Sequence, residues 1–410
     1  MKKIFFVAIA ATLLAAGCQK TEVLNQVNPV DGTSMTFSPN MGKLTKVAAE
    51  ATGEANLSDQ DFRLWAYYKA DDPSRGEAAK ANSIYDKMEN IIVSDGAVGA
   101  ATGSWKATTT HFWPGKGKWL KFYAISADED TYGKDEGPDA TDSKVSIDPA
   151  NNKMTVTNFI VKHDLPDTDL MVADYTEAKQ KETDSETNTV NFTFRHALTK
   201  VEFLFRNSEP TMPVYVQQMY VEDINTIGTL TVTGTLGQKN SISWSAPTGR
   251  QLFKGDNTTT GEKLEYTKAD NYDTDWNKNV TITDNVYMTL TEEYERFTTW
   301  LVIPQDVYKA GEGENAKPTT DLKVTIAYVI KSGEEYRQFV STFPLGTAAN
   351  AVTAWDDNQY VKYNINLTPN IISFDATVEP WEPIVPDKDD EGNDLPNNPS
   401  NDGKDVGINQ

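Results

Sequence analysis

The residues that could support chemistry in this chain are few and widely spaced. Cys18 is the only cysteine among 410 residues, and the three histidines are His111, His163 and His196. Their separation does not fit the compact ligand spacing of a zinc site. No serine lies in a Gly-x-Ser-x-Gly turn, the arrangement that exposes a nucleophile in hydrolases. We therefore predict that the chain is not an enzyme and uses no cofactor, and that His196, which lies among strand residues, is a structural hydrogen-bonding group.

Acidic clusters raise the question of calcium binding. Asp128, Asp130 and Gly133 partly match a calcium loop, but Tyr132 occupies a ligand position. A second partial match, at residues 387–392, lacks the glutamate that closes such a loop. The 60 acidic residues also make chance carboxylate pairs common, and nothing singles out two for glycosidic cleavage. We predict no metal site and no glycan hydrolase.

Three tryptophans gather around one turn. Trp105, Trp113 and Trp119 flank the segment His111–Gly115. An exposed aromatic platform of this kind could bind a sugar. Aromatic rings in β-proteins more often fill the core, so we favour burial and keep glycan binding as the alternative.

The lone cysteine is best explained by the sequence before it. Lys2 and Lys3 precede an apolar run over 4–14, and small residues ending in Gly17 precede Cys18. This order predicts a lipoprotein signal peptide over 1–17, cleaved between Gly17 and Cys18, with a lipid on Cys18. An ordinary secretory signal with a chance cysteine is the alternative, but a single thiol has no partner in an oxidising compartment. The lipid would attach the protein to the outer membrane.

The net charge narrows the range of partners. It is −22 for the whole chain and falls to near −24 when the two lysines of the signal peptide are removed. Such an acidic chain will not bind nucleic acid through phosphates, and charge will not draw it to an anionic membrane surface. No later stretch approaches the ~20 apolar residues of a membrane span.

Apolar residues recur with a period of two along most of the chain, as in β-strands. In residues 62–69, Phe62, Leu64, Ala66 and Tyr68 form one face, with Arg63, Trp65, Tyr67 and Lys69 opposite. Similar runs predict further strands: 190–195, 201–206, 322–330, 361–367 and 372–378. Each run would bury one face and expose the other to water, as antiparallel sheets do. We predict an all-β protein of two β-sandwiches.

Composition divides the chain further. We predict a polar tether over 18–34, an N-terminal β-sandwich domain over 35–189 and a C-terminal one over 190–383. The boundary follows a polar, charged stretch that ends where the strand from Val190 begins. Residues 384–410 are rich in Asp, Asn and Pro, which predicts a disordered tail.

The order of several segments resembles the fimbrillin family, the subunits of type V pili in Gram-negative anaerobes. These segments are Met35–Ser38, Lys43–Val47, Phe62–Tyr68, Phe192–Phe203, Tyr363–Thr368 and Ile372–Trp381. The resemblance implies two tandem transthyretin-like β-sandwich domains. It also implies export as a lipoprotein, removal of the first strand by a protease, and refilling of the vacated groove by a strand of a neighbouring subunit.

Carried onto this chain, the resemblance places Met35 and Phe37 on the removable strand and the processing loop around Lys43 and Lys46. The processing protease of that family prefers arginine, whereas the first arginine here is Arg63, inside a predicted strand. Without cleavage the lipid would stay, as in an anchor or accessory subunit.

The terminal strand carries Ile372, Phe374 and Trp381, and it is the candidate donor to a neighbour because the tail from Asp387 does not alternate. Absence of a donor would suit a tip subunit. We therefore predict a structural or adhesive pilus subunit at the outer membrane or cell surface. Its partners would be other subunits and a host or bacterial surface ligand. The alternative is a permanently lipid-anchored glycan-binding protein.

Overall fold

The structure is a computed structural model in which the described residues form strands and no helix. These residues are 33–40, 61–69, 81–95, 105–115, 118–126, 144–161, 169–180, 188–245, 247–256, 282, 287–311, 319–346, 352–369 and 372–381. The all-β prediction is confirmed, and each of the predicted strands listed above is present. Within these residues, a search for membrane-spanning helices found none.

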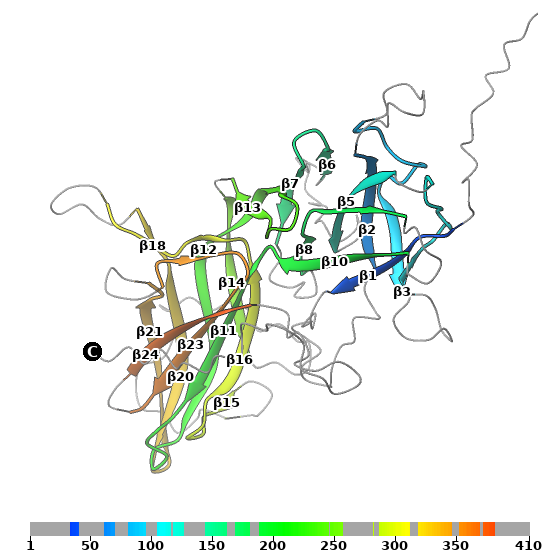
Figure 1. Cartoon of the computed structure of the whole chain (residues 1–410). Coiled ribbons are helices and arrows are strands. Elements are labelled where there is room, and N and C mark those ends of the chain that lie inside the picture. Colours follow the sequence, from blue (N-terminus) through cyan, green and yellow to red (C-terminus); the bar gives the residue numbers. More distant parts are fainter. Residues whose placement is uncertain are drawn as a thin grey trace, which may run out of the picture.

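One sheet closes on itself. Its strands are β1 (Thr36–Asn40), β2 (Phe62–Tyr68), β3 (Ile91–Asp95), β4 (Trp105–Ala107), β5 (Trp119–Ser126), β8 (Met171–Ala173), β9 (Thr176–Lys179) and β10 (Thr189–His196). They pair in the order β2-β3-β4-β1-β10-β8-β5-β9, and β2 also pairs with β5. The pairing of β2 with β5 closes seven of these strands, all except β9, into what we call the strand ring (Figure 1).

The strands β2 and β5 are buried on both faces. Phe62 and Leu64 point into the ring, whereas Trp65 and Tyr67 belong to a second buried cluster that includes Met154. The prediction that Trp65 and Tyr67 face solvent is therefore wrong. The other face of β2 packs against the rest of the molecule instead of against water.

Two further sheets pack as a sandwich. One contains β6 (Lys144–Asp148), β7 (Lys153–Ile160), β12 (Val214–Thr233), β13 (Ser241–Trp244), β14 (Thr248–Asp256), β15 (Met288–Thr289), β20 (Lys323–Ser332) and β21 (Glu335–Pro344). The other has the order β16 (Glu295–Val302), β11 (Thr199–Arg206), β23 (Gln359–Leu367) and β24 (Ile372–Pro380). Phe253 of the first lies 5.5 Å from Trp300 of the second, ring centre to ring centre.

Short strand pairs complete the described fold. They are β17 (Gln305–Asp306) with β22 (Ala354–Trp355), and β18 (Tyr308–Lys309) with β19 (Thr320–Asp321).

The long strand β12 pairs with strands from both sides of residue 190, the predicted domain boundary. Residues 214–221 pair with β20, and residues 227–233 pair with β7 farther along the same strand. The hairpin of β6 and β7 precedes residue 190 and β12 follows it, so one sheet spans the predicted domain boundary. The division at residue 190 stays a prediction, and the two parts share hydrogen bonds as well as an apolar core.

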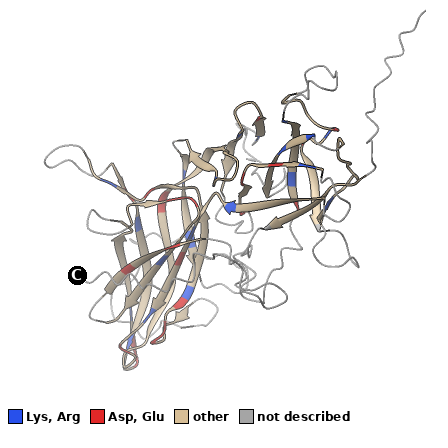
Figure 2. Ribbon diagram, in the orientation of Figure 1, with Lys and Arg blue, Asp and Glu red and all other residues tan. Residues whose placement is uncertain are grey.

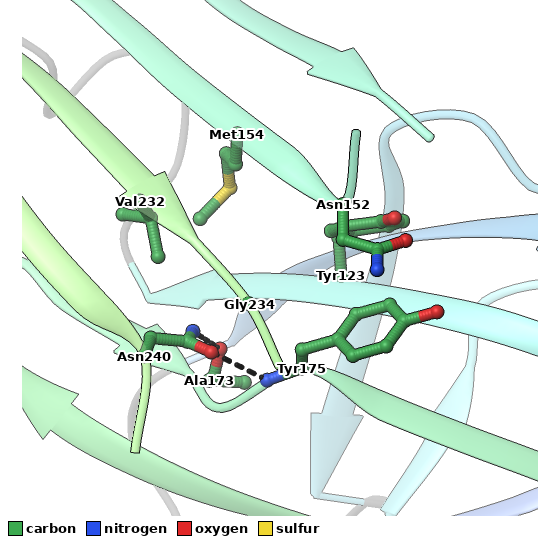
Figure 3. A pocket seen from close by; sticks show the side chains of 8 residues that line it. All are labelled: Tyr123, Asn152, Met154, Ala173, Tyr175, Val232, Gly234 and Asn240. Atoms are coloured by element: carbon green, nitrogen blue, oxygen red, sulfur yellow. Dashed lines mark hydrogen bonds between the residues drawn. The ribbon is translucent and has the colours of Figure 1, made fainter. Parts of the chain in front are cut away.

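Hydrogen bonds of Asn240 connect the strand ring to the sandwich (Figure 3). Asn240 accepts a hydrogen bond from the Tyr175 amide at 2.9 Å and donates one to the Ala173 carbonyl at 2.8 Å. The backbone amide of Asn240 donates to the Asp174 carboxylate at 3.0 Å, and this carboxylate also forms an ion pair with Arg195 at 2.9 Å. The cavity beside these residues measures about 10 Å³, about the space of one water molecule, so the joint is closely packed.

Charged residues are spread over both bodies. Figure 2 shows lysine and arginine mixed with aspartate and glutamate along the strands rather than gathered on one face of the described part. That the chain does not bind nucleic acid stays a prediction.

Candidate functional site

The first strand closes the ring. Residues 36–40 of β1 pair in parallel with residues 189–193 of β10, and Phe37 pairs in antiparallel fashion with Trp105 of β4. In the described residues, β1 is the element that connects β4 to β10. Removing β1 would therefore open a slot with an unpaired strand edge on each side, the arrangement that accepts an added strand.

Phe37 of β1 and Met35, which directly precedes this strand, belong to the buried cluster inside the ring. Met35 and Phe37 are buried, Phe37 to 1 % exposure. The Phe37 ring stacks on Phe192 at 6.3 Å between centres, and Phe192 makes edge contacts with Phe62 and Phe122. This aromatic cluster would become the apolar floor of the slot if β1 left.

Hydrogen bonds hold the segment before β1. The Met35 amide donates to the His111 carbonyl at 2.8 Å, and the Trp113 amide donates to the Thr33 carbonyl at 3.0 Å. The Tyr85 hydroxyl donates to the carbonyl of Phe112, which lies between His111 and Trp113. Burial, with Asp86 nearby, raises the pKa of Tyr85 well above its ordinary value, so this hydroxyl keeps its proton and its donor role.

The candidate processing loop lies outside the described residues. The strand β1 ends at Asn40 and β2 begins at Phe62, and Lys43 and Lys46 fall in the interval between them. The lipidation site at Gly17 and Cys18 also lies outside the described residues, as do most of the predicted tether and the tail.

The last strand lies at an edge of the sandwich. In antiparallel register, β24 pairs with β23 from Ile372 opposite Leu367 to Pro380 opposite Gln359. Its other edge has no paired strand among the described residues. Ile372 and Phe374 face the core, and the Phe374 ring stacks on Tyr363 at 5.3 Å. The strand thus alternates inward apolar and outward polar residues, as a strand donated to a neighbour must.

A buried tryptophan follows β24. The Trp381 ring stacks on His196 of β10, with 3.6 Å between centres and 6° between planes. The Trp381 amide donates to the Asn358 carbonyl at 2.7 Å. Nδ1 of His196 lies 2.8 Å from Oδ2 of Asp169. The strand β1 and the residue that follows β24 therefore both contact β10.

Comparison with known proteins shows the family of this chain. Residues 45–381 match a protein-family model described as fimbrillin-like, which covers most of the chain and ends at Trp381. The chain belongs to the fimbrillin-like family. It is accordingly a fimbrial or cell-adhesion type of protein, and the prediction that it is not an enzyme is confirmed.

Several solved structures are similar to this fimbrillin-like chain. A fimbrial protein from Bacteroides vulgatus shares 17% identity, covering 84% of this chain and 99% of that one, with a TM-score of 0.47. The tip fimbrial protein of Porphyromonas gingivalis shares 9% identity over 85% and 99%, with a TM-score of 0.34. A fimbrial assembly protein from Parabacteroides distasonis shares 11% over 85% and 98%, with a TM-score of 0.30. No curated protein matches the chain.

The tryptophans of this fimbrillin-like protein do not form a platform. Trp105 and Trp113 are buried in the ring, Trp113 to 2 % exposure, so the favoured interpretation is confirmed for both. It is wrong for Trp119, which is 41 % exposed. The Nζ atoms of Lys69 and Lys179 lie 5.2 and 5.5 Å from the centre of its ring, so two lysine side chains cover it.

The histidines have structural surroundings. His196 is fully buried against Asp169 and Trp381, but neither of its ring nitrogens makes a hydrogen bond within the described residues, so its predicted hydrogen-bonding role stays a prediction. Nδ1 of the buried His111 lies 3.3 Å from Asp86, and His163 is outside the described residues. Among the described residues, no group of three or more His, Cys, Asp or Glu side chains is placed to hold a metal ion.

Sequence reasoning missed two features of this site. It did not find that β1 pairs with β10, because the partners are 153 residues apart and no local pattern encodes that distance. It also missed Asp169 as the partner of His196, since a buried acid in a loop has no distinctive spacing. The shared alternation of Met35 and Phe37 with Val190 and Phe192 was the available signal.

Proposed function

We propose that this chain is a structural or adhesive subunit of a type V pilus, assembled by strand exchange. The observation that carries the proposal is the place of β1, which closes the ring and can be detached by one cut after Asn40. Strand loss would expose the aromatic floor around Phe192, and an incoming strand would cover it again. The free energy of that burial would drive assembly without a chemical reaction.

The proposal includes the ends of the chain. Export as a lipoprotein on Cys18, with cleavage between Gly17 and Cys18, would hold the subunit at the outer membrane. Cleavage near Lys43 or Lys46 would then remove Met35 and Phe37 together with the lipid. The terminal strand with Ile372, Phe374 and Trp381 would serve as the donor.

The same proposal assigns the larger units. Residues 35–189 and 190–383 would be two transthyretin-like domains, followed by a disordered tail over 384–410. Partners would be other pilus subunits and, for an adhesive subunit, a ligand on a host or bacterial surface. The permanently lipid-anchored glycan-binding alternative is weakened by the burial of Trp105 and Trp113.

Mass spectrometry of the N-terminus tests the processing step. We expect two forms in cells, a precursor with lipid on Cys18 and an assembled form that begins within residues 41–61. If protein in isolated fimbriae still carried the lipid on Cys18, removal of β1 would be ruled out and an anchor role would replace it.

A further inference from the structure

The strand β10 has two halves with different partners. Residues 189–193 pair with β1, and residues 194–196 pair with β8. The Asp174 amide adds a hydrogen bond to the Thr193 carbonyl at 2.8 Å. Within the described residues, 189–192 therefore have β1 as their ladder partner and no other strand. Loss of β1 leaves this half of β10 without sheet pairing, although Val190 and Phe192 are buried.

The far half of β10 ends on the stack with Trp381. His196 is fully buried, and its ring lies flat against the indole at 3.6 Å. Oδ2 of Asp169 lies 2.8 Å from Nδ1 at the edge of the imidazole, a close contact without the geometry of a hydrogen bond. The Ser126 hydroxyl donates to the Asp169 carbonyl at 2.9 Å and so fixes the backbone that carries this acid. One end of β10 thus depends on β1 and the other contacts the end of β24.

The end of β24 has few buried side chains, although its backbone pairs with β23 as far as Pro380. Residues 377–380 are exposed, and Val378 has 41 % of its surface free. The strand is paired along one edge alone in the described part of the chain. Trp381 is 6 % exposed and is the buried side chain at this end. Its stack on His196 is therefore the main buried side-chain contact at the C-terminal end of β24, beside the backbone ladder with β23 and the exposed Lys362–Glu379 ion pair at 2.8 Å.

We propose that Trp381 is a latch that holds β24 on its own sheet, and that β10 connects this latch to β1. While β1 is in place, β10 is paired along its length and His196 keeps Trp381 seated. When β1 leaves, the unpaired half of β10 loosens, His196 shifts against the indole, and the end of β24 is released. Dispersion contact between stacked rings weakens steeply with small displacements, which makes the stack a sensitive link.

The latch rests on the strand-exchange proposal. It adds an order to the two events, the opening of the acceptor slot and the release of the donor strand. The donor strand would become available after the acceptor slot opens. A subunit that still carries β1 would then neither accept a strand nor donate one. The strand β10 would coordinate the two events within one chain.

Amide hydrogen exchange tests the latch in the chain that lacks the signal peptide but still carries β1. We expect Trp381→Ala to speed amide exchange in residues 372–381 about tenfold, the effect of losing one aromatic stack, relative to residues 323–332 of β20. Trp381→Phe, which keeps an aromatic ring, and Val378→Ala, on the exposed face, should exchange like the wild type. A uniform rise across all strands in Trp381→Ala would show a general structural role and overturn the latch.

A second variant tests the link through β10 with Trp381 intact. Phe37→Ala weakens the seating of β1, and we expect faster exchange in residues 189–192 and also in 372–381, again relative to β20. Faster exchange in 189–192 with no change in 372–381 would overturn the link. Assembly is scored separately on chain cut after Asn40. Assembly without faster exchange in 372–381 refutes the latch alone, whereas faster exchange without assembly refutes strand exchange alone.

Discussion

Phe37 is the side chain that seats the first strand, β1, in the ring. It is buried to 1 % exposure inside the ring and stacks on Phe192. A short strand of five residues has few backbone hydrogen bonds, so side-chain burial must provide much of its hold. Phe37 therefore connects the sequence of β1 to the stability of the ring.

Replacing Phe37 with alanine should lower the free energy of unfolding by about 3–5 kcal/mol, the cost of removing a buried phenylalanine and leaving a cavity. Chemical denaturation measures this loss. Leu236→Ala is the matched control, because Leu236 is 52 % exposed and its loss should change stability by less than about 0.5 kcal/mol. Equal effects of the two substitutions would show that β1 is not seated as described.

At the residue scale, the sequence predicted some roles and not others. The family resemblance placed Met35 and Phe37 on a removable strand; both side chains are buried, and the removal stays a prediction. The single cysteine predicted a lipid, which lies outside the described residues. Trp119 shows the limit of such inference, because the same residue type is buried at Trp113 and exposed at Trp119. What decides between them is the three-dimensional neighbourhood, because Trp113 packs 6.3 Å from Phe122 inside the ring whereas Trp119 has no place in that core.

At the scale of elements, strand positions were predictable and strand partners were not. The period-two pattern located β2, β10, β11, β20, β23 and β24 because half-buried strands alternate. The pattern of β2 was misinterpreted on one face, although its nearly continuous apolar residues are typical of a strand buried on both sides. Long-range pairings, such as β7 with β12 or β1 with β10, depend on tertiary packing that no local period encodes.

A row of tyrosines lies where the ring meets the rest of the fold, and it predicts alkaline sensitivity. Burial, with a smaller effect of Glu89, raises the pKa of Tyr67 from 10.0 to about 12. Burial also raises the pKa of Tyr123 and of Tyr175, whose rings lie 5.7 Å apart. The folded chain keeps these phenol protons at a pH where the unfolded chain loses them. Stability should therefore fall as the pH rises from 10 to 12.

Denaturant midpoints at pH 8, 10 and 11 check this expectation. Tyr67→Phe should reduce the alkaline loss of stability, because it removes one of the groups that must ionise. Leu236→Ala, at an exposed position without an ionisable group, should leave the pH dependence unchanged. A midpoint that stays constant up to pH 11 would contradict the burial of these phenols.

At the scale of the whole molecule, the first and last strands meet on one element. The strand β1 pairs with one half of β10, and Trp381 after β24 stacks on the residue that ends the other half. The chain belongs to the fimbrillin-like family, and under the proposed strand exchange these two strands would provide the groove and the donor for neighbouring subunits. The sequence predicted the family from the order of its segments, but the meeting of the two ends on β10 required the fold.

The most direct test of strand exchange is the size of the protein after β1 is removed. A specific protease site placed between Asn40 and Asp61 allows the purified mature chain to be cut, and light scattering follows its mass. We predict that the cut chain forms polymers that resist mild denaturant and that excess peptide of residues 33–40 blocks their growth by refilling the slot. Cut chain that loses residues 33–40 and stays monomeric, with or without the peptide, would contradict the account.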